Sequence, residues 1–125
     1  MILFVEDDSL SRRAFAQILR AEGYQVAEAE NGVEALEILN TGAEVLANEA
    51  FDLVIVDLVL PGLHGVNLVH QIRAKWPKMP IIVISGYLSE GPGKVILEGF
   101  AEFIEKPIDS AALIAAVRRL LSAKI

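Results

Sequence analysis

The stretch DLVIVD, residues 52–57, contains four consecutive apolar residues between two aspartates, and a second apolar run, IIVI, occupies residues 81–84. A strand with one face in water alternates apolar and polar residues, whereas these runs are apolar at every position. Strands of this kind are buried on both faces, as in a parallel sheet that carries helices on both sides. The two runs therefore predict the central strands of such a sheet.

Three further runs extend the same pattern in both directions along the chain, at residues 2–5, 25–29 and 103–105. Segments of helical period separate the runs, and this alternation is typical of repeated βαβ units. No internal repeat or linker interrupts it. The sequence predicts an α/β fold, a doubly wound five-stranded parallel sheet, with residues 1–125 forming one domain.

The predicted helices differ in how clearly they are delimited. The first is expected to end at Gly23, a natural left-handed residue after a helix, and the third near Trp76, because Pro77 follows. Asp109 or Ser110 can cap the last helix. The apolar stripes expected to face the core are Leu10, Ala14, Phe15, Ile18 and Leu19 in the first helix, and Leu113, Ala116, Val117, Leu120 and Leu121 in the last.

The second helix leaves two interpretations open. Its apolar residues Leu36, Leu39, Ala43 and Leu46 keep a helical period through Thr41-Gly42. A glycine inside a helix costs about 1 kcal/mol relative to alanine. The segment is therefore either one unusually long helix or two pieces that meet at Gly42.

Composition argues against several classes of function. The net charge of −6 disfavours contact with nucleic acid by this domain, and no apolar run approaches the ~18 residues of a membrane-spanning helix. Met1 leads directly into the first apolar run, so no signal peptide is expected. The absence of cysteine suits a reducing compartment, and we expect a cytoplasmic location.

Polar side chains follow the predicted strands where a doubly wound sheet holds its sites, at the carboxyl ends of the strands. Glu6 and Asp7 follow the first strand, Asp57 the third, Ser85 the fourth and Lys106 the fifth. Adjacent carboxylates repel one another, so the run Glu6-Asp7-Asp8 is either dispersed in solvent or placed to surround a cation.

Four segments, ILFVEDD, DLVIVDLVLPGLHG, IIVISG and FIEKP, closely resemble in this order the receiver domain of bacterial response regulators. The resemblance covers essentially the whole chain. It implies the flavodoxin-like strand order 2-1-3-4-5, in which Asp7 and Asp57 would face each other across the crevice between the first and third strands.

The resemblance also implies a Mg²⁺ site, and Mg²⁺ is a hard cation that prefers carboxylate and water oxygens. Asp57 is then the phosphoacceptor, Asp7 a direct metal ligand, and Glu6 a second acidic partner acting through water. The backbone carbonyl of Val59 would complete the protein's share of the coordination. Asp8 is the remaining carboxylate, expected at the start of the first helix, where negative charge is favourable.

Further residues take roles in phosphoryl transfer by the same resemblance. Lys106 would neutralise charge on the phosphoryl oxygens, and the hydroxyl of Ser85 would donate a hydrogen bond to them, together with the backbone N–H of Gly86. Ser85 and Phe103 would form the switch that alters the surface made by helix four, strand five and helix five. Helix four is expected to be short or to start late, since Gly91-Pro92-Gly93 lies where it normally begins.

The partners implied are a sensor histidine kinase or phosphotransfer protein upstream and an effector domain or protein downstream. A homodimer through the switch surface is left open. We expect no enzymatic turnover. A Mg²⁺-dependent aspartyl phosphatase would need a second acid two residues after Asp57, where Val59 stands. Flavin binding, which the flavodoxin-like fold would suggest, is disfavoured because the phosphate of the cofactor would lie against the acidic run Glu6-Asp7-Asp8. The remaining alternative is an interaction module that acts without phosphorylation.

Overall fold

The computed structural model describes residues 1–46, 51–57, 65–85, 102–105 and 108–122, and of residues 42–46, 65–66, 85 and 105 it describes the backbone only. Strands and helices alternate through most of the chain. Their order is β1 (Ile2–Val5), α1 (Ser9–Ala21), β2 (Val26–Ala29), α2 (Gly32–Leu46), β3 (Leu53–Asp57), α3 (Gly65–Lys75), β4 (Ile81–Ser85), β5 (Glu102–Glu105) and α5 (Ser110–Ser122).

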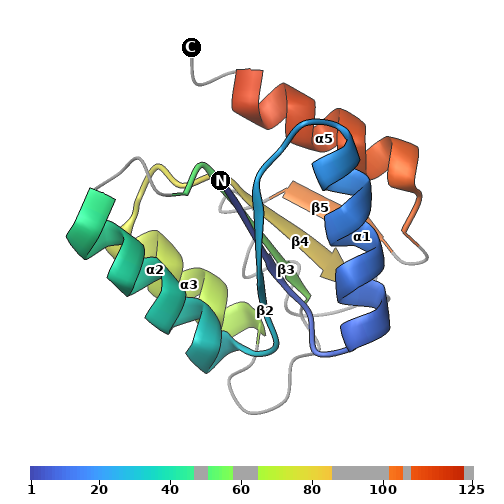
Figure 1. The fold of residues 1–125 in the computed structure, drawn as a ribbon. Coiled ribbons are helices and arrows are strands. Elements are labelled where there is room, and N and C mark those ends of the chain that lie inside the picture. The colour runs from blue at the N-terminus through green and yellow to red at the C-terminus, as the bar shows by residue number, and fades with distance from the viewer. Residues whose placement is uncertain (47–50, 58–64, 86–101, 106–107, 123–125) are drawn as a thin grey trace.

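The strands form one five-stranded sheet in the order β2-β1-β3-β4-β5, and every neighbouring pair is parallel. This confirms the predicted fold class and the flavodoxin-like order. The direction of winding reverses at β1, so β1 and β3 lie side by side although α1, β2 and α2 separate them in the chain (Figure 1). The carboxyl ends of β1 and β3 therefore meet at one edge of the sheet.

Alternating side chains of the buried strands supply two separate cores. On one face, Ile2, Phe4 and Ile55 pack with α1 and α5. On the other face, Leu3, Val5 and Val54 pack with α2 and α3. Figure 1 shows the resulting three layers, with α1 and α5 on one side of the sheet and α2 and α3 on the other. The central runs at residues 53–56 and 81–84 are thus buried on both faces, as their composition predicts.

The stripe predicted for the first helix is partly wrong. Leu10 is 80% exposed and Ala14 is exposed, while the buried residues of α1 are Arg12, Ala16 and Leu19. Leu10 lies two residues before Arg12, which is about 200° around a helix axis, so Leu10 is on the face opposite the core. Phe15 and Leu19 do pack in the core, so the helical period was correct and the error lies in Leu10 and Ala14.

The end of α1 is a Schellman motif, as the position of Gly23 indicates. Gly23 has a φ of 99° and donates its backbone N–H to the carbonyl of Arg20 at 3.0 Å, and Tyr24 donates to the carbonyl of Leu19 at 3.2 Å. These two bonds satisfy carbonyls that the helix itself leaves without partners. The chain then turns directly into β2.

The second helix is one long helix: α2 continues through Thr41 and Gly42 to Leu46. The hydroxyl of Thr41 donates to the carbonyl of Glu37 at 2.9 Å, one turn earlier. Apolar packing of residues such as Ala35 and Leu39 against the sheet offsets the cost of the glycine. The interpretation with a break at Gly42 is therefore wrong.

The remaining helix ends agree with prediction. Helix α3 ends at Lys75, directly before Trp76 and Pro77. Asp109 caps α5 by accepting a hydrogen bond from the N–H of Ala111 at 3.1 Å. Among the residues that the structure describes, no helix is both long enough and apolar enough to span a bilayer.

Candidate functional site

The sheet brings the acidic residues of two distant segments together. In the parallel ladder between β1 and β3, Val5 is the partner of Val56. Each is followed by an acidic residue: Glu6 comes directly after β1, and Asp57 is the last residue of β3. The backbone N–H of Glu6 still bonds to the carbonyl of Ala29 in β2, at 3.0 Å, so the chain leaves the sheet only after Glu6.

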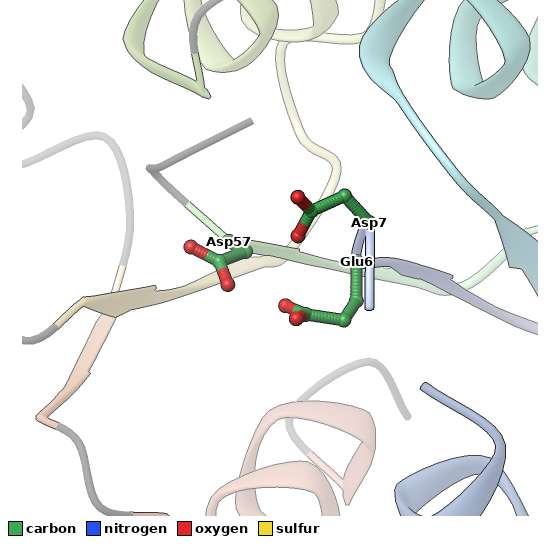
Figure 2. Close-up of side chains that lie close together, drawn as sticks. All are labelled: Glu6, Asp7 and Asp57. Atoms are coloured by element: carbon green, nitrogen blue, oxygen red, sulfur yellow. The ribbon is translucent and has the colours of Figure 1, made fainter. Parts of the chain in front are cut away.

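Glu6, Asp7 and Asp57 form a cluster of three carboxylates, with one oxygen from each lying within 4.8 Å of the others. Figure 2 shows Glu6 and Asp7 leaving opposite sides of the chain, with both carboxylates directed toward the side of Asp57. Asp57 is 2% exposed, Glu6 is half-buried and Asp7 is exposed. The cluster therefore has a buried floor and an open mouth.

This donor set fits a hard divalent cation. Two unit charges at this separation repel by roughly 3 kcal/mol at an effective dielectric constant near 20, so a cation among them would relieve a substantial cost. Mg²⁺ holds oxygen ligands at about 2.1 Å, which sets opposite ligands roughly 4.2 Å apart. The three carboxylates are thus near enough to share one ion, either directly or with a water between.

Asp8 does not belong to the cluster. Its carboxylate caps α1 by accepting hydrogen bonds from the hydroxyl of Ser11 at 2.6 Å and from the N–H of Ser11 at 3.2 Å. These bonds hold the pKa of Asp8 below its ordinary value of 3.8. The run of three acids therefore divides into two residues at the sheet edge and one helix cap, as predicted.

The family model of the response regulator receiver domain matches residues 2–118. This chain belongs to the response regulator receiver family. The predicted resemblance is thereby confirmed over nearly the full length of the domain.

Relatives of this receiver domain occur in proteins of different overall design. It is 37% identical over 109 residues to a cyclic di-GMP phosphodiesterase of Thermotoga maritima, covering 86% of this chain and 27% of that protein. It is 33% identical to the sensor kinase CckA of Brucella abortus, covering 96% of this chain and 12% of the kinase. The receiver domain thus spans between about an eighth and about a quarter of these two curated relatives.

A solved structure of similar shape is the response regulator TrrA of Thermotoga maritima, in complex with Mg(2+)-BeF. It is 32% identical to this receiver domain, with a TM-score of 0.82, and the match covers 96% of this chain and 97% of that one. The comparison of structures and the family model therefore indicate the same family.

The other site residues predicted for the receiver domain are described in part. Ser85 is the last residue of β4, one position beyond Ile84, the partner of Asp57 in the ladder. Phe103, in β5, is partly buried against the core shared with α2 and α3. Val59, Gly86 and Lys106 lie outside the described residues, as does the segment from Gly91 to Gly93.

Sequence reasoning missed Arg12, to which it assigned no role. Within the described part of the receiver domain, Arg12 and Asp57 are the charged side chains that are buried, at 6% and 2% exposure. The available signal was the spacing of Arg12, Ala16 and Leu19, which places the arginine on the inner face of α1.

Proposed function

We propose that this receiver domain accepts a phosphoryl group on Asp57 from a phosphohistidine of a sensor kinase or phosphotransfer protein, in a reaction that requires Mg²⁺. The observation that carries the proposal is the position of Asp57, a buried carboxylate whose oxygen lies within 4.8 Å of those of Glu6 and Asp7. The related response regulator TrrA in complex with Mg(2+)-BeF supports the choice of metal.

The transfer is a displacement at phosphorus. A carboxylate oxygen of Asp57 forms a bond to phosphorus, the bond from phosphorus to the imidazole nitrogen breaks, and the imidazole takes the electron pair. Asp7, Asp57, the carbonyl of Val59 and, through water, Glu6 would hold Mg²⁺, which would supply positive charge against the phosphoryl oxygens. Lys106, Ser85 and the N–H of Gly86 would stabilise the remaining oxygens.

The product changes charge at one place in the domain. An aspartyl phosphate adds roughly −1.5 to −2 charges, and a local change of this kind can bias a two-state surface. We propose Ser85 and Phe103 as the residues that relay it to the surface around β5 and α5. We expect an effector, in the same protein or in another, to bind this surface. We also propose that the protein acts in the cytoplasm.

The decisive experiment is intact mass spectrometry after incubation with acetyl phosphate. With Mg²⁺ the protein should gain one phosphoryl group, and it should gain none without Mg²⁺ or in Asp57→Asn. Asp8→Asn removes a charge from the same acidic run without touching the cluster, and it should be modified like the parent. An unchanged mass of the parent protein would contradict the proposal.

A second readout addresses turnover. Because Val59 stands where an aspartyl phosphatase needs its acid, the protein should not release phosphate steadily from a generic phosphoester. Steady release that Asp57→Ala abolishes would show that the chain is an enzyme instead.

A further inference from the structure

The guanidinium of Arg12 contacts the segment that carries the acidic cluster. Its Nη1 donates to the backbone carbonyl of Glu6 at 2.9 Å, and its Nε donates to Oε1 of Glu28 in β2 at 3.2 Å. The side chain is buried, and Nη2 lies 4.0 Å from Oε1 of Glu30 at the outer side. One residue of α1 thus connects the end of β1 to β2.

Both polar groups of the Glu6 backbone are therefore bonded. Its N–H is bound to the carbonyl of Ala29, and its carbonyl is bound to Arg12. The carbonyl of Glu6 belongs to the planar peptide group that joins Glu6 to Asp7, so its direction sets where Asp7 lies relative to Glu6. A rotation about the bond between the Cα and the carbonyl carbon of Glu6 would move the carboxylate of Asp7 relative to those of Glu6 and Asp57.

The arginine is itself held in place from the other side. Glu28 receives Arg12 through Oε1 and Arg20 through Oε2, the latter at 3.3 Å. Arg20 also donates to the carbonyl of Val26 at 2.7 Å. The carboxylate of Glu28 thus lies between two arginines of α1. Because Arg20 holds Glu28, Glu28 can in turn hold the guanidinium of Arg12 where it bonds the carbonyl of Glu6.

We propose that Arg12 is a positioning residue for the metal site, holding the Glu6-Asp7 peptide so that the two carboxylates converge with Asp57. This inference rests on the proposed Mg²⁺ site. Arginine suits the task because its planar fork can bond a carbonyl and a carboxylate at once, whereas the ammonium group of lysine is a compact point charge. Removal of groups that orient metal ligands typically weakens metal binding 10–100-fold.

The experiment compares Arg12→Met with Arg20→Met by calorimetric titration of Mg²⁺ into the unphosphorylated protein. Both variants lose an arginine bound to Glu28 and to one backbone carbonyl, but only Arg12 bonds the segment of the acidic cluster. We expect the Kd for Mg²⁺ to rise roughly ten-fold in Arg12→Met. In Arg20→Met we expect it to change by less than about two-fold, since the Glu6 carbonyl keeps its partner.

Two further measurements separate positioning from stability. The urea midpoint of metal-free Arg12→Met should fall further than that of Arg20→Met, because the side chain of Arg12 is 7% exposed and that of Arg20 is 43% exposed. The Mg²⁺ titrations are therefore run under conditions where circular dichroism shows both variants fully folded, so that a loss of Mg²⁺ affinity confined to Arg12→Met cannot come from unfolding. The amide shifts of Glu6 and Asp7 in the metal-free protein should move in Arg12→Met and stay in place in Arg20→Met. If Arg12→Met does not fold, Arg12→Lys replaces it, with the same direction expected.

The possible failures are distinguishable. If the parent protein binds Mg²⁺ and both arginine variants bind it equally well, the role of Arg12 is refuted while the metal site stands. Equal weakening in both variants would also refute it, because the effect would then come from Glu28. If the parent protein binds no Mg²⁺, the proposed function and this inference fail together.

Discussion

The carboxylate of Asp8 is bonded twice to Ser11, once through the hydroxyl and once through the backbone N–H. Its two neighbours toward the N-terminus, Glu6 and Asp7, converge with Asp57 instead. Three consecutive acidic residues thus perform two tasks, capping a helix and forming the cluster. This division provides matched variants that remove the same charge from adjacent positions.

Mg²⁺ should stabilise the fold through Asp7 and not through Asp8. A ligand that binds only the folded state raises the free energy of unfolding by about 2.7 kcal/mol at a concentration of 100 times its Kd. In Asp7→Asn most of this gain should disappear, while Asp8→Asn should retain it, since asparagine also caps helices well. Urea unfolding with and without Mg²⁺ measures the gain. Its loss in Asp8→Asn would place the ion elsewhere in the acidic run.

Asp8 should make the free energy of unfolding depend on pH in the acidic range. Its pKa in the folded protein is lowered by Ser11, so the ionised form favours folding, and this contribution is fully present above the ordinary value of 3.8. It is lost as the pH falls through the lower folded-state pKa. The parent protein should therefore lose stability relative to Asp8→Asn in urea unfolding followed from about pH 5 to about pH 2. Parallel curves for the two proteins would contradict this assignment.

The turn after α1 should require glycine. No atom outside the turn lies within 4 Å of the position that a Cβ on Gly23 would occupy, so a side chain meets no steric obstacle there. The backbone φ of 99° is nevertheless unfavourable for residues with a side chain. We expect Gly23→Ala to lower the free energy of unfolding by about 1–2 kcal/mol, and Gly23→Asn by less, because asparagine tolerates this region. Chemical denaturation of the three proteins checks the order.

The two leucines of α1 should respond very differently to truncation. Leu10 is 80% exposed, so Leu10→Ala should change the free energy of unfolding by less than about 0.5 kcal/mol. Leu19 is fully buried between α1 and the sheet, and Leu19→Ala should cost about 2–5 kcal/mol. A large loss in Leu10→Ala would mean that the face of α1 opposite the core is covered by something else.

The sheet could be predicted from the sequence because its strands carry their own signal. Runs such as Leu53–Val56 are apolar at consecutive positions, which identifies central strands without knowledge of the partner strands. The convergence of Asp7 with Asp57 followed from the strand order that the family resemblance implied. The same resemblance separated Asp8 from the cluster.

The orientation of α1 could not be predicted in the same way. A helical period shows that one face is apolar, but the face toward the sheet is decided by packing, and in α1 that face includes a charged residue. Arg12 is buried because Glu28 and the Glu6 carbonyl satisfy its guanidinium, and both partners lie outside the helix. A prediction based on hydrophobicity alone therefore assigned Leu10 to the core and gave Arg12 no place in it.

The crossing of the chain between β1 and β3 has a consequence for folding kinetics. The acidic oxygens come from residues 6, 7 and 57, so no fragment that stops before β3 can bring them together. Ion binding then requires closure of a long loop, and closure costs entropy before any contact compensates for it. Magnesium should accordingly bind after the folding transition state, and it should lower the unfolding rate more than it raises the folding rate.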